Sequence, residues 1–201
     1  MLTIDEGRDD ALSELTLLYT SSKSWDDLVA LYVELGNCTQ IYELLDVKAS
    51  DCESDEERMS LYARMATVAE DNLNDADMAI AALEKILAVD PKHETTARRL
   101  LAYYSDRGEH AKAISMHEIL LSLTENDEDR LATYIEIARL YEEELAELEN
   151  AATYLAKAIL IASDRQDLRE HFEALVEATQ LYQLLYDVYV ELLGRDNVDD
   201  S

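Results

Sequence analysis

The four histidines of this chain, His93, His110, His117 and His171, are the first side chains to test for chemistry. His110 and His117 are separated by about two helical turns, which places them near one face of a helix. A metal site on a helix favours a spacing of four, and no acidic side chain lies between these two to complete a ligand set. We therefore predict polar surface histidines and no metal site.

Acidic pairs such as Asp26-Asp27 and Glu142-Glu143 are candidates for general acid–base catalysis. Such catalysis needs carboxyl groups held in a desolvated cleft with separated pKa values. These pairs fall opposite the apolar face of amphipathic helices, so we expect a solvated surface. The densest cluster, Glu125 to Asp129, lacks the oxygen ligand and glycine of a calcium-binding loop, because Leu131 and Ala132 stand there. No glycine-rich phosphate loop occurs either, so the sequence predicts no enzyme and no cofactor.

Cys38 and Cys52 are the only cysteines of the chain. They are too far apart to form a Cys-x-x-Cys motif, and no histidine stands at ligand spacing from either one. We expect both to act as small, buried or half-buried apolar side chains.

The charge of the chain limits its partners. Its 45 acidic and 17 basic residues give a net charge of −28, which repels nucleic acids and anionic membrane surfaces. Solubility of a leucine-rich helical protein accounts for this charge. Attraction of a basic partner and adaptation to high salt are the two alternatives. With no apolar run of about 18 residues and no signal-peptide pattern, we expect a cytoplasmic protein, unless a further segment precedes residue 1.

A long sequence repeat organises the helices that must position these side chains. Residues 55–71 return as residues 127–143, and we call the constant offset between the two copies the repeat period. The matched pairs are Arg58 and Arg130, Tyr62 and Tyr134, Ala66 and Ala138, Glu70 and Glu142, Tyr32 and Tyr104, and Gly36 and Gly108. With only 4 glycines and 1 proline, the chain is predicted to be all α. At about 36 residues per helical hairpin, it should contain about ten helices.

We predict one α-solenoid of antiparallel helical hairpins over residues 1–201. Its parts are an orphan or capping helix at 2–20, hairpins at 24–51, 55–90, 93–124, 127–163 and 167–194, and a polar tail at 195–201. Residues 11–17 resemble residues 82–88, which lie second in their hairpin, so the partner of the first helix is missing. We infer that the chain is cut from a longer array or that this helix caps its end.

Caps and turns divide the predicted helices. The predicted N-caps are Ser24, Ser54, Asp75, Asn126 and a polar segment at 163–166. Phe172, Val176 and Tyr186 stand one repeat period beyond Leu100, Tyr104 and Ile114, which marks the last hairpin as a third copy. Gln180 there replaces Gly108, so this turn is expected to be looser or the two helices nearly continuous.

Trp25, Leu28, Tyr32 and Gly36 have the spacing Trp-x2-Leu-x3-Tyr-x3-Gly. This pattern resembles the first helix of the tetratricopeptide repeat, in which the bulky residues pack on the partner helix and the glycine makes the turn. Tyr134, Ile137, Ala138 and Tyr141 fit the same pattern, and Ala79, Leu83 and Pro91 resemble the second helix. Two units exceed the usual repeat length, which is similar to degenerate long-repeat arrays of bacterial scaffold proteins. The resemblance places Trp25 in the core.

The resemblance also implies a partner-binding groove, because the first helix of each tetratricopeptide hairpin lines a concave surface. The groove-facing residues, transferred by register, are Asp26, Ala30, Val33, Glu34, Ala63, Thr67, Glu70, Asp71, Arg98, Ala102, Ser105, Asp106, Ile135, Arg139, Glu142 and Glu143. Arg98 and Arg139 are expected to pair with Glu70, Asp106 or Glu142 across neighbouring helices. The family's carboxylate clamp needs Lys or Arg with Asn across adjacent units, and here the clamp positions are Asp26, Ala63, Arg98 and Ile135, which argues against binding of chaperone tails.

The leading hypothesis is a non-catalytic protein–protein interaction scaffold, part of a larger protein, that binds a basic or amphipathic peptide or protein in an acidic groove. One alternative is a peptide-sensing regulatory domain of a transcriptional or signalling regulator. Another is a helical-repeat enzyme or a substrate-recruiting subunit. Thermal stabilisation by short peptides would favour the sensor. Co-purified proteins of fixed stoichiometry would favour the scaffold, and activity of the isolated chain would favour the enzyme or substrate-recruiting subunit.

Overall fold

The computed structural model describes the backbone of residues 3–199 and the side chains of residues 11–194. Within this described part of the chain there are eleven α-helices, two π-helical turns and no strand, which confirms the all-α, helical-repeat class. The chain divides into two compact units, Met1–Pro91 and Lys92–Ser201. The grouping of all helices into one solenoid stays a prediction.

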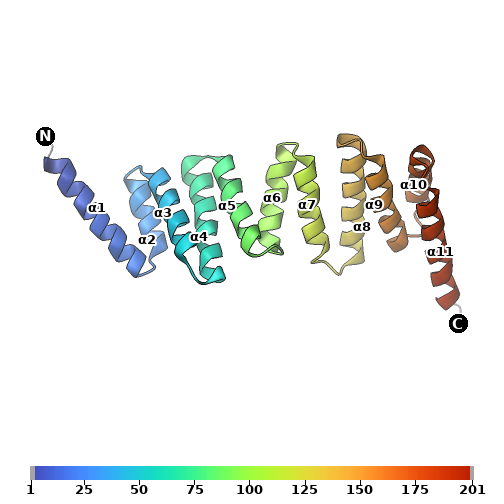
Figure 1. Ribbon diagram of the computed structural model, residues 1–201, viewed down its shortest axis with the longest axis horizontal. Coiled ribbons are helices and arrows are strands. Elements are labelled where there is room, and N and C mark those ends of the chain that lie inside the picture. The colour runs from blue at the N-terminus through green and yellow to red at the C-terminus, as the bar shows by residue number, and fades with distance from the viewer. Residues whose placement is uncertain (1–2, 200–201) are drawn as a thin grey trace. The chain divides into compact units, whose positions relative to one another are not determined.

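The first unit is a row of antiparallel helices in which each helix packs against the next (Figure 1). Its elements are α1 (Thr3–Ser21), α2 (Trp25–Glu34), α3 (Cys38–Asp51), α4 (Asp55–Val68), the π-helical turn η1 (Ala69–Leu73) and α5 (Ala76–Val89). Apolar side chains spaced by three or four residues give each helix one buried face. The largest fully buried side chains of this unit are Leu28, Ile41, Leu45, Leu61, Met65, Val68 and Leu83.

The second unit repeats this arrangement (Figure 1). Its elements are α6 (Glu94–Asp106), α7 (His110–Leu121), α8 (Asp127–Arg139), the π-helical turn η2 (Leu140–Glu144), α9 (Leu148–Ile161), α10 (Gln166–Thr179) and α11 (Tyr182–Asp199). Ile137, Leu155, Ile159 and Phe172 form its core and are at most 1% exposed. Helix α11 continues through most of the segment predicted as a polar tail, because no helix-breaking proline interrupts it. Leu2 and residues 200–201 lie outside the described residues.

Three of the predicted N-caps are confirmed. Ser54 accepts a hydrogen bond from the Glu57 N–H, Asp75 accepts one from the Met78 N–H, and Asn126 accepts from the two N–H groups that follow Asp127.

The predicted caps at Ser24 and at residues 163–166 are wrong. Ser24 stands at the N-cap of α2 without a side-chain cap bond, and its hydroxyl accepts a hydrogen bond from Ser22 instead. Arg165 stands at the N-cap of α10, and its guanidinium group pairs with Asp167. These polar segments therefore mark helix starts without supplying the bond that a capping side chain normally makes.

Tight turns separate the helices of the short hairpins. Gly36 and Gly108 have φ angles of +70° and +67°, in the left-handed region that glycine adopts without strain. Gln180, which replaces the glycine in the last hairpin, has a φ angle of +61°. The expected looser turn or continuous helix at Gln180 is therefore wrong, because glutamine adopts the same left-handed conformation there.

The recurring side chains pack as the period predicts, with two exceptions. Tyr32, Tyr62 and Tyr104 are buried, and so are Ala66 and Ala138. Phe172 and Val176 of the third copy are also buried. The exceptions are Tyr134 and Tyr186, and Trp25, which the family resemblance placed in the core, is also only half-buried.

These three side chains are exposed to different degrees. Tyr134 is half-buried and lines a cavity, whereas Tyr186 is 64% exposed while its counterpart Ile114 is 2% exposed. Trp25 is half-buried because it is the first residue of α2 and part of its ring faces solvent. A change of Trp25 to alanine should therefore cost less than the about 3–5 kcal/mol typical of a buried tryptophan. Cys38 and Cys52 are both free and half-buried, as predicted.

Candidate protein-binding surface

The predicted groove residues of the first unit lie on α2, α4 and η1, and all of them reach solvent. Ala63 and Glu70 are half-buried, and the exposed ones are Asp26, Ala30, Val33, Glu34, Thr67 and Asp71. An ion pair joins Asp26 of α2 to Arg64 of α4. The structure therefore brings these sides of α2 and α4 next to each other, as first helices of neighbouring hairpins should be.

The predicted groove residues of the second unit lie on α6, α8 and η2. The exposed ones are Arg98, Ala102, Ser105, Asp106 and Glu143, and the half-buried ones are Ile135, Arg139 and Glu142. His171 of α10 lies 2.8 Å from the Glu142 carboxylate, which joins η2 to the first helix of the following hairpin. Arg98 also lines a cavity with side chains of α7 and α8, among them His117 and Asp129.

The expected pairing of the two groove arginines across neighbouring helices is wrong. Arg98 pairs with Glu94 at 2.8 Å, one turn earlier on α6. Arg139 pairs with Glu136 and Glu143 at 2.8 Å and reaches Glu144 at 3.8 Å. Pairs spaced by three or four residues on one helix form readily because these side chains are neighbours on the helix surface.

These pairs also shift the pKa values of the groups involved. Hydrogen bonds to Glu136 and Glu143 raise the pKa of Arg139, and the bond from Arg139 lowers the pKa of Glu136. The Arg64 guanidinium lowers the pKa of Asp26 in the same way. Arg139 therefore stays charged beside these carboxylates.

The two π-helical turns are the feature of this surface that sequence reasoning missed. They hold four predicted groove residues, namely Glu70 and Asp71 in η1 and Glu142 and Glu143 in η2. A π turn accommodates an extra residue within a helix. The unusual length of the two repeats that contain these turns was the available signal.

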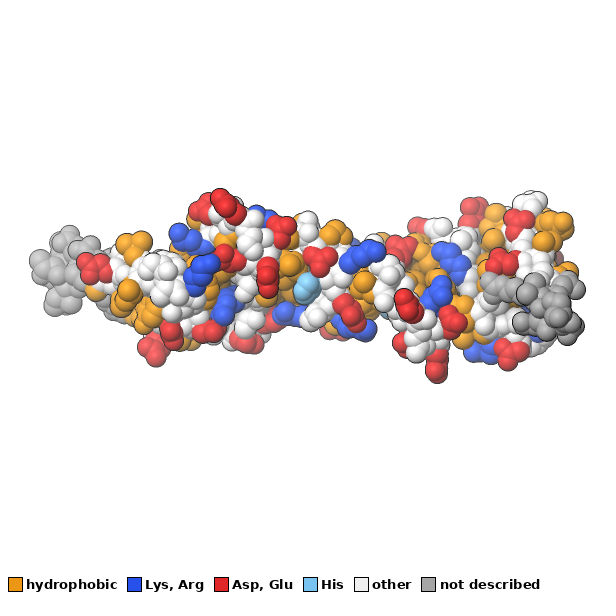
Figure 2. All heavy atoms as spheres, turned by 90° about the horizontal axis from the view of Figure 1, so that it is seen from below, with side chains coloured by type: hydrophobic (Ala, Val, Ile, Leu, Met, Phe, Trp, Pro, Cys, Tyr) orange, Lys and Arg blue, Asp and Glu red, His pale blue; other side chains and the backbone are white. Residues whose placement is uncertain are grey.

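Charge is spread over the molecular surface in a mixed pattern. Figure 2 shows one face on which acidic side chains stand among basic and apolar ones in both units. The histidines take local partners: His110 lies 3.4 Å from Glu144, and the His93 ring caps α6 by accepting from the Thr96 N–H. Among the side chains that the structure describes, no group of three or more His, Cys, Asp or Glu residues could hold a metal ion. No described helix is long and apolar enough to cross a lipid bilayer.

A comparison with protein families agrees with this helical-repeat class. A family model described as tetratricopeptide repeat matches residues 101–131, which comprise the end of α6, all of α7 and the start of α8. No curated protein matches the chain. A solved structure entitled "MamA RS-1 ArsTM double mutant" is 14% identical, with 89% of this chain and 96% of that chain covered, at a TM-score of 0.42. That likeness is too weak to argue from.

The packed antiparallel hairpins thus define an all-α helical-repeat protein. Its residues 101–131 match the tetratricopeptide-repeat family. Proteins of this family generally act as scaffolds that bind proteins or peptides, and they are typically not enzymes.

Proposed function

We propose that the protein is a non-catalytic scaffold that binds a basic or amphipathic segment of another protein on the acidic surface formed by the first helices of its hairpins. The observation that carries this proposal is the acidic composition of the two π-helical turns. Each turn ends a first helix and presents adjacent carboxylates, at Glu70 and Asp71 in one unit and at Glu142 and Glu143 in the other.

The balance of charge around η2 supports a basic partner. Arg139 offsets one of the four carboxylates of Glu136, Glu142, Glu143 and Glu144, so three negative charges remain there when the adjacent His110 and His171 carry no charge. Such a surface attracts cationic side chains and speeds their association, an effect that salt weakens.

Apolar groove residues support an amphipathic partner. Val33 is 38% exposed on α2, and Ile135 is half-buried on α8 next to the acidic turn of its own helix. An amphipathic helix can place its apolar side chains against such residues while its lysines or arginines reach the carboxylates.

The test uses the full chain and an amphipathic helical peptide built from lysine and leucine. Changing Glu142→Lys together with Glu143→Lys should weaken binding about tenfold or more, because two attractive charges become repulsive. The measurement is isothermal titration calorimetry at low and at high salt, and the wild-type affinity should fall as salt rises.

A matched variant controls for the net charge of the chain. Glu43→Lys with Glu149→Lys makes the same change of charge at exposed positions on second helices, α3 and α9. This control should bind within about twofold of the wild type. Equal weakening by the two double variants would mean that the peptide responds only to total charge, and the proposed surface would be abandoned.

A further inference from the structure

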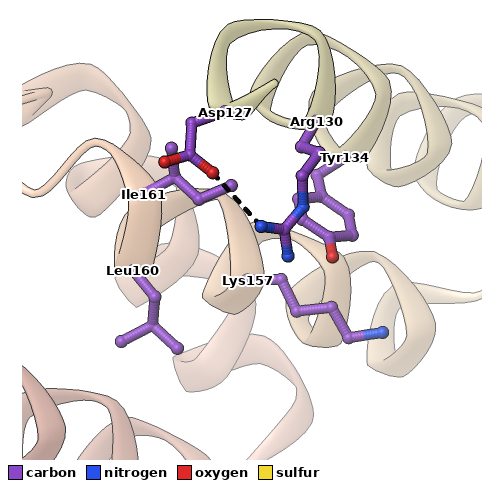
Figure 3. Close-up of a pocket in the computed structure, with 6 residues that line it drawn as sticks. All are labelled: Asp127, Arg130, Tyr134, Lys157, Leu160 and Ile161. Atoms are coloured by element: carbon purple, nitrogen blue, oxygen red, sulfur yellow. Dashed lines mark hydrogen bonds and ion pairs between the residues drawn. The ribbon is translucent and has the colours of Figure 1, made fainter. Parts of the chain in front are cut away.

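A cavity of about 450 Å³ lies between α8 and α9 of the second unit, away from the acidic turn η2. It is lined by Asp127, Arg130, Tyr134, Lys157, Leu160 and Ile161. Figure 3 shows that Arg130 and Lys157 come from different helices and that both extend beside the Tyr134 ring. Two cations at one cavity are unusual in a chain whose net charge is −28.

The counterpart of Lys157 in the first unit binds a carboxylate of the protein itself. Lys85 stands one repeat period before Lys157, and its Nζ lies 2.5 Å from the Asp46 carboxylate of α3. The same ammonium group lies 5.5 Å from the centre of the Tyr62 ring. A carboxylate and an aromatic face therefore satisfy this lysine together.

The second unit keeps the lysine and the aromatic face, but the matching carboxylate binds a different side chain. Glu118 of α7 stands one repeat period after Asp46, and it accepts a hydrogen bond from the Tyr154 hydroxyl. Tyr154 occupies the place that Ala82 has in the first unit. Lys157 lies 4.1 Å from the centre of the Tyr154 ring and 5.8 Å from that of Tyr134. Among the described side chains, no carboxylate forms an ion pair with Lys157.

The arginine of the pair shows the same contrast. Arg58 in the first unit donates to the backbone carbonyls of Ala49 and Cys52, at 3.3 and 2.5 Å, and also pairs with Asp55. Arg130 pairs with Asp127 at 3.1 Å and lies over the Tyr134 ring at 6.0 Å.

The connections that precede the two arginines also differ in length. The segment 52–54 joins α3 to α4, whereas the longer segment 122–126 joins α7 to α8. Among the described residues, Arg130 donates to no backbone carbonyl of α7.

We propose that the cavity between α8 and α9 binds a carboxylate group of a protein partner, held by Lys157 and Arg130 in the place that Asp46 fills for Lys85. Leu160 and Ile161 form an apolar wall, so an acidic side chain or a chain terminus beside an apolar residue fits the site. Asp127 at the rim would repel a doubly charged phosphate more strongly than a carboxylate. This inference is independent of the proposed acidic surface, because it concerns other residues and the opposite charge.

The test titrates the full chain with three short peptides and follows its backbone amide signals by nuclear magnetic resonance. Acetyl-Ala-Glu-Leu-amide offers a side-chain carboxylate, acetyl-Ala-Ala-Leu with a free carboxyl end offers a terminal one, and acetyl-Ala-Gln-Leu-amide offers neither. We expect millimolar binding of one or both carboxylate peptides, with shifts at α8 and α9. Equal binding of the glutamine peptide would overturn the proposal.

Two matched variants locate the site. Lys157→Met keeps the apolar contact with the rings and should weaken binding about fivefold or more, whereas Lys85→Met removes a lysine that is already paired and should change binding less than about twofold. Asp127→Asn should strengthen binding because it removes a repelling charge from the rim. Thermal unfolding of each variant separates loss of binding from loss of folding. Equal effects of Lys157→Met and Lys85→Met in folded variants would overturn the proposal.

Discussion

The hairpin of α4, η1 and α5 and the hairpin of α8, η2 and α9 are two copies of one sequence pattern in different surroundings. Both carry an arginine, a tyrosine and a lysine at matched places. In the first copy the cations bind the preceding helix α3, through Asp46 and two backbone carbonyls. In the second copy they line a cavity. A repeat can therefore conserve its charged residues while changing whether they bind the protein itself or remain available to a ligand.

One substitution accounts for much of this difference. Tyr154 in place of Ala82 adds a ring that stacks with Tyr141 at 5.6 Å between ring centres. It also adds a hydroxyl that donates a hydrogen bond to the Glu118 carboxylate. Burial, followed by the hydrogen bond to Glu118, raises the pKa of Tyr154, so this hydroxyl stays protonated and keeps donating. The acceptor that the first copy offers to its lysine is thus used by a tyrosine in the second copy.

The largest expected effect tests whether the cores of the two copies are packed in the same way. Ala66→Leu and Ala138→Leu each place a larger side chain at a position that is at most 1% exposed. Each change should lower the free energy of unfolding by about 1–3 kcal/mol, because the neighbouring helix cannot move away without losing its own contacts. Urea unfolding followed by circular dichroism measures both. A cost in only one copy would show that the cores differ more than the sequence period indicates.

The next effect concerns the turn after each π-helical segment. Asn74 and Ala146 occupy matched places, with φ angles of +50° and +55°. Asparagine tolerates this left-handed conformation, whereas alanine is strained in it. Ala146→Gly should raise the free energy of unfolding by about 1 kcal/mol, and Asn74→Gly should change it much less. Equal changes in the two unfolding curves would contradict the assigned strain.

A smaller effect should separate the two lysines. Lys85→Met removes an ion pair and leaves Asp46 without its cation, so it should cost about 0–1 kcal/mol of stability, because both side chains are more than a third exposed. Lys157→Met should cost less than Lys85→Met because no carboxylate is left behind. Thermal unfolding at low salt gives the most sensitive comparison. A greater loss of stability for Lys157→Met than for Lys85→Met would contradict the assignment of Lys85 as the lysine with an ion pair inside the protein.

The smallest effect depends on pH and belongs to the second unit alone. Burial lowers the pKa of His117, on α7 opposite Glu136 of α8 and beside Arg98 of α6. The unfolded chain therefore binds the proton more readily, so this residue's contribution to stability is complete above about pH 6.5 and is lost as the pH falls through the lowered pKa. Relative to His117→Gln, the wild type should lose thermal stability between pH 7 and pH 5. A constant difference between the two melting temperatures would exclude this titration.

The repeat period was enough to predict the class of fold and many packed positions. Tyr104, Ala138 and Phe172 could be placed in the core because their spacing along the helices matches that of their counterparts. Tyr186 could not be placed correctly, because a periodic count does not reveal which side of a terminal helix lacks a neighbour. Trp25 could not be placed correctly either, because the family pattern does not show how much of a side chain at the start of a helix reaches solvent.

The details of the candidate sites could be predicted less well. The groove residues were assigned by register, and their accessibility to solvent is observed, but nothing in the sequence showed that Arg98 and Arg139 would pair within their own helices. The cavity between α8 and α9 was also missed. Its signal was the exchange of Ala82 for Tyr154, which alters hydrogen bonding without altering the helical pattern.

The π-helical turns bear on how the repeats could change length during evolution. A single inserted residue in the middle of an ordinary helix would rotate every later side chain by about 100° and expose its buried face. A π-helical turn near the helix end holds more residues per turn and so absorbs the added residue. The second helix of the hairpin still starts in register, with Ala79 and Ala151 both fully buried. Repeats of unequal length can therefore be joined in one chain without disturbing the packing of their neighbours.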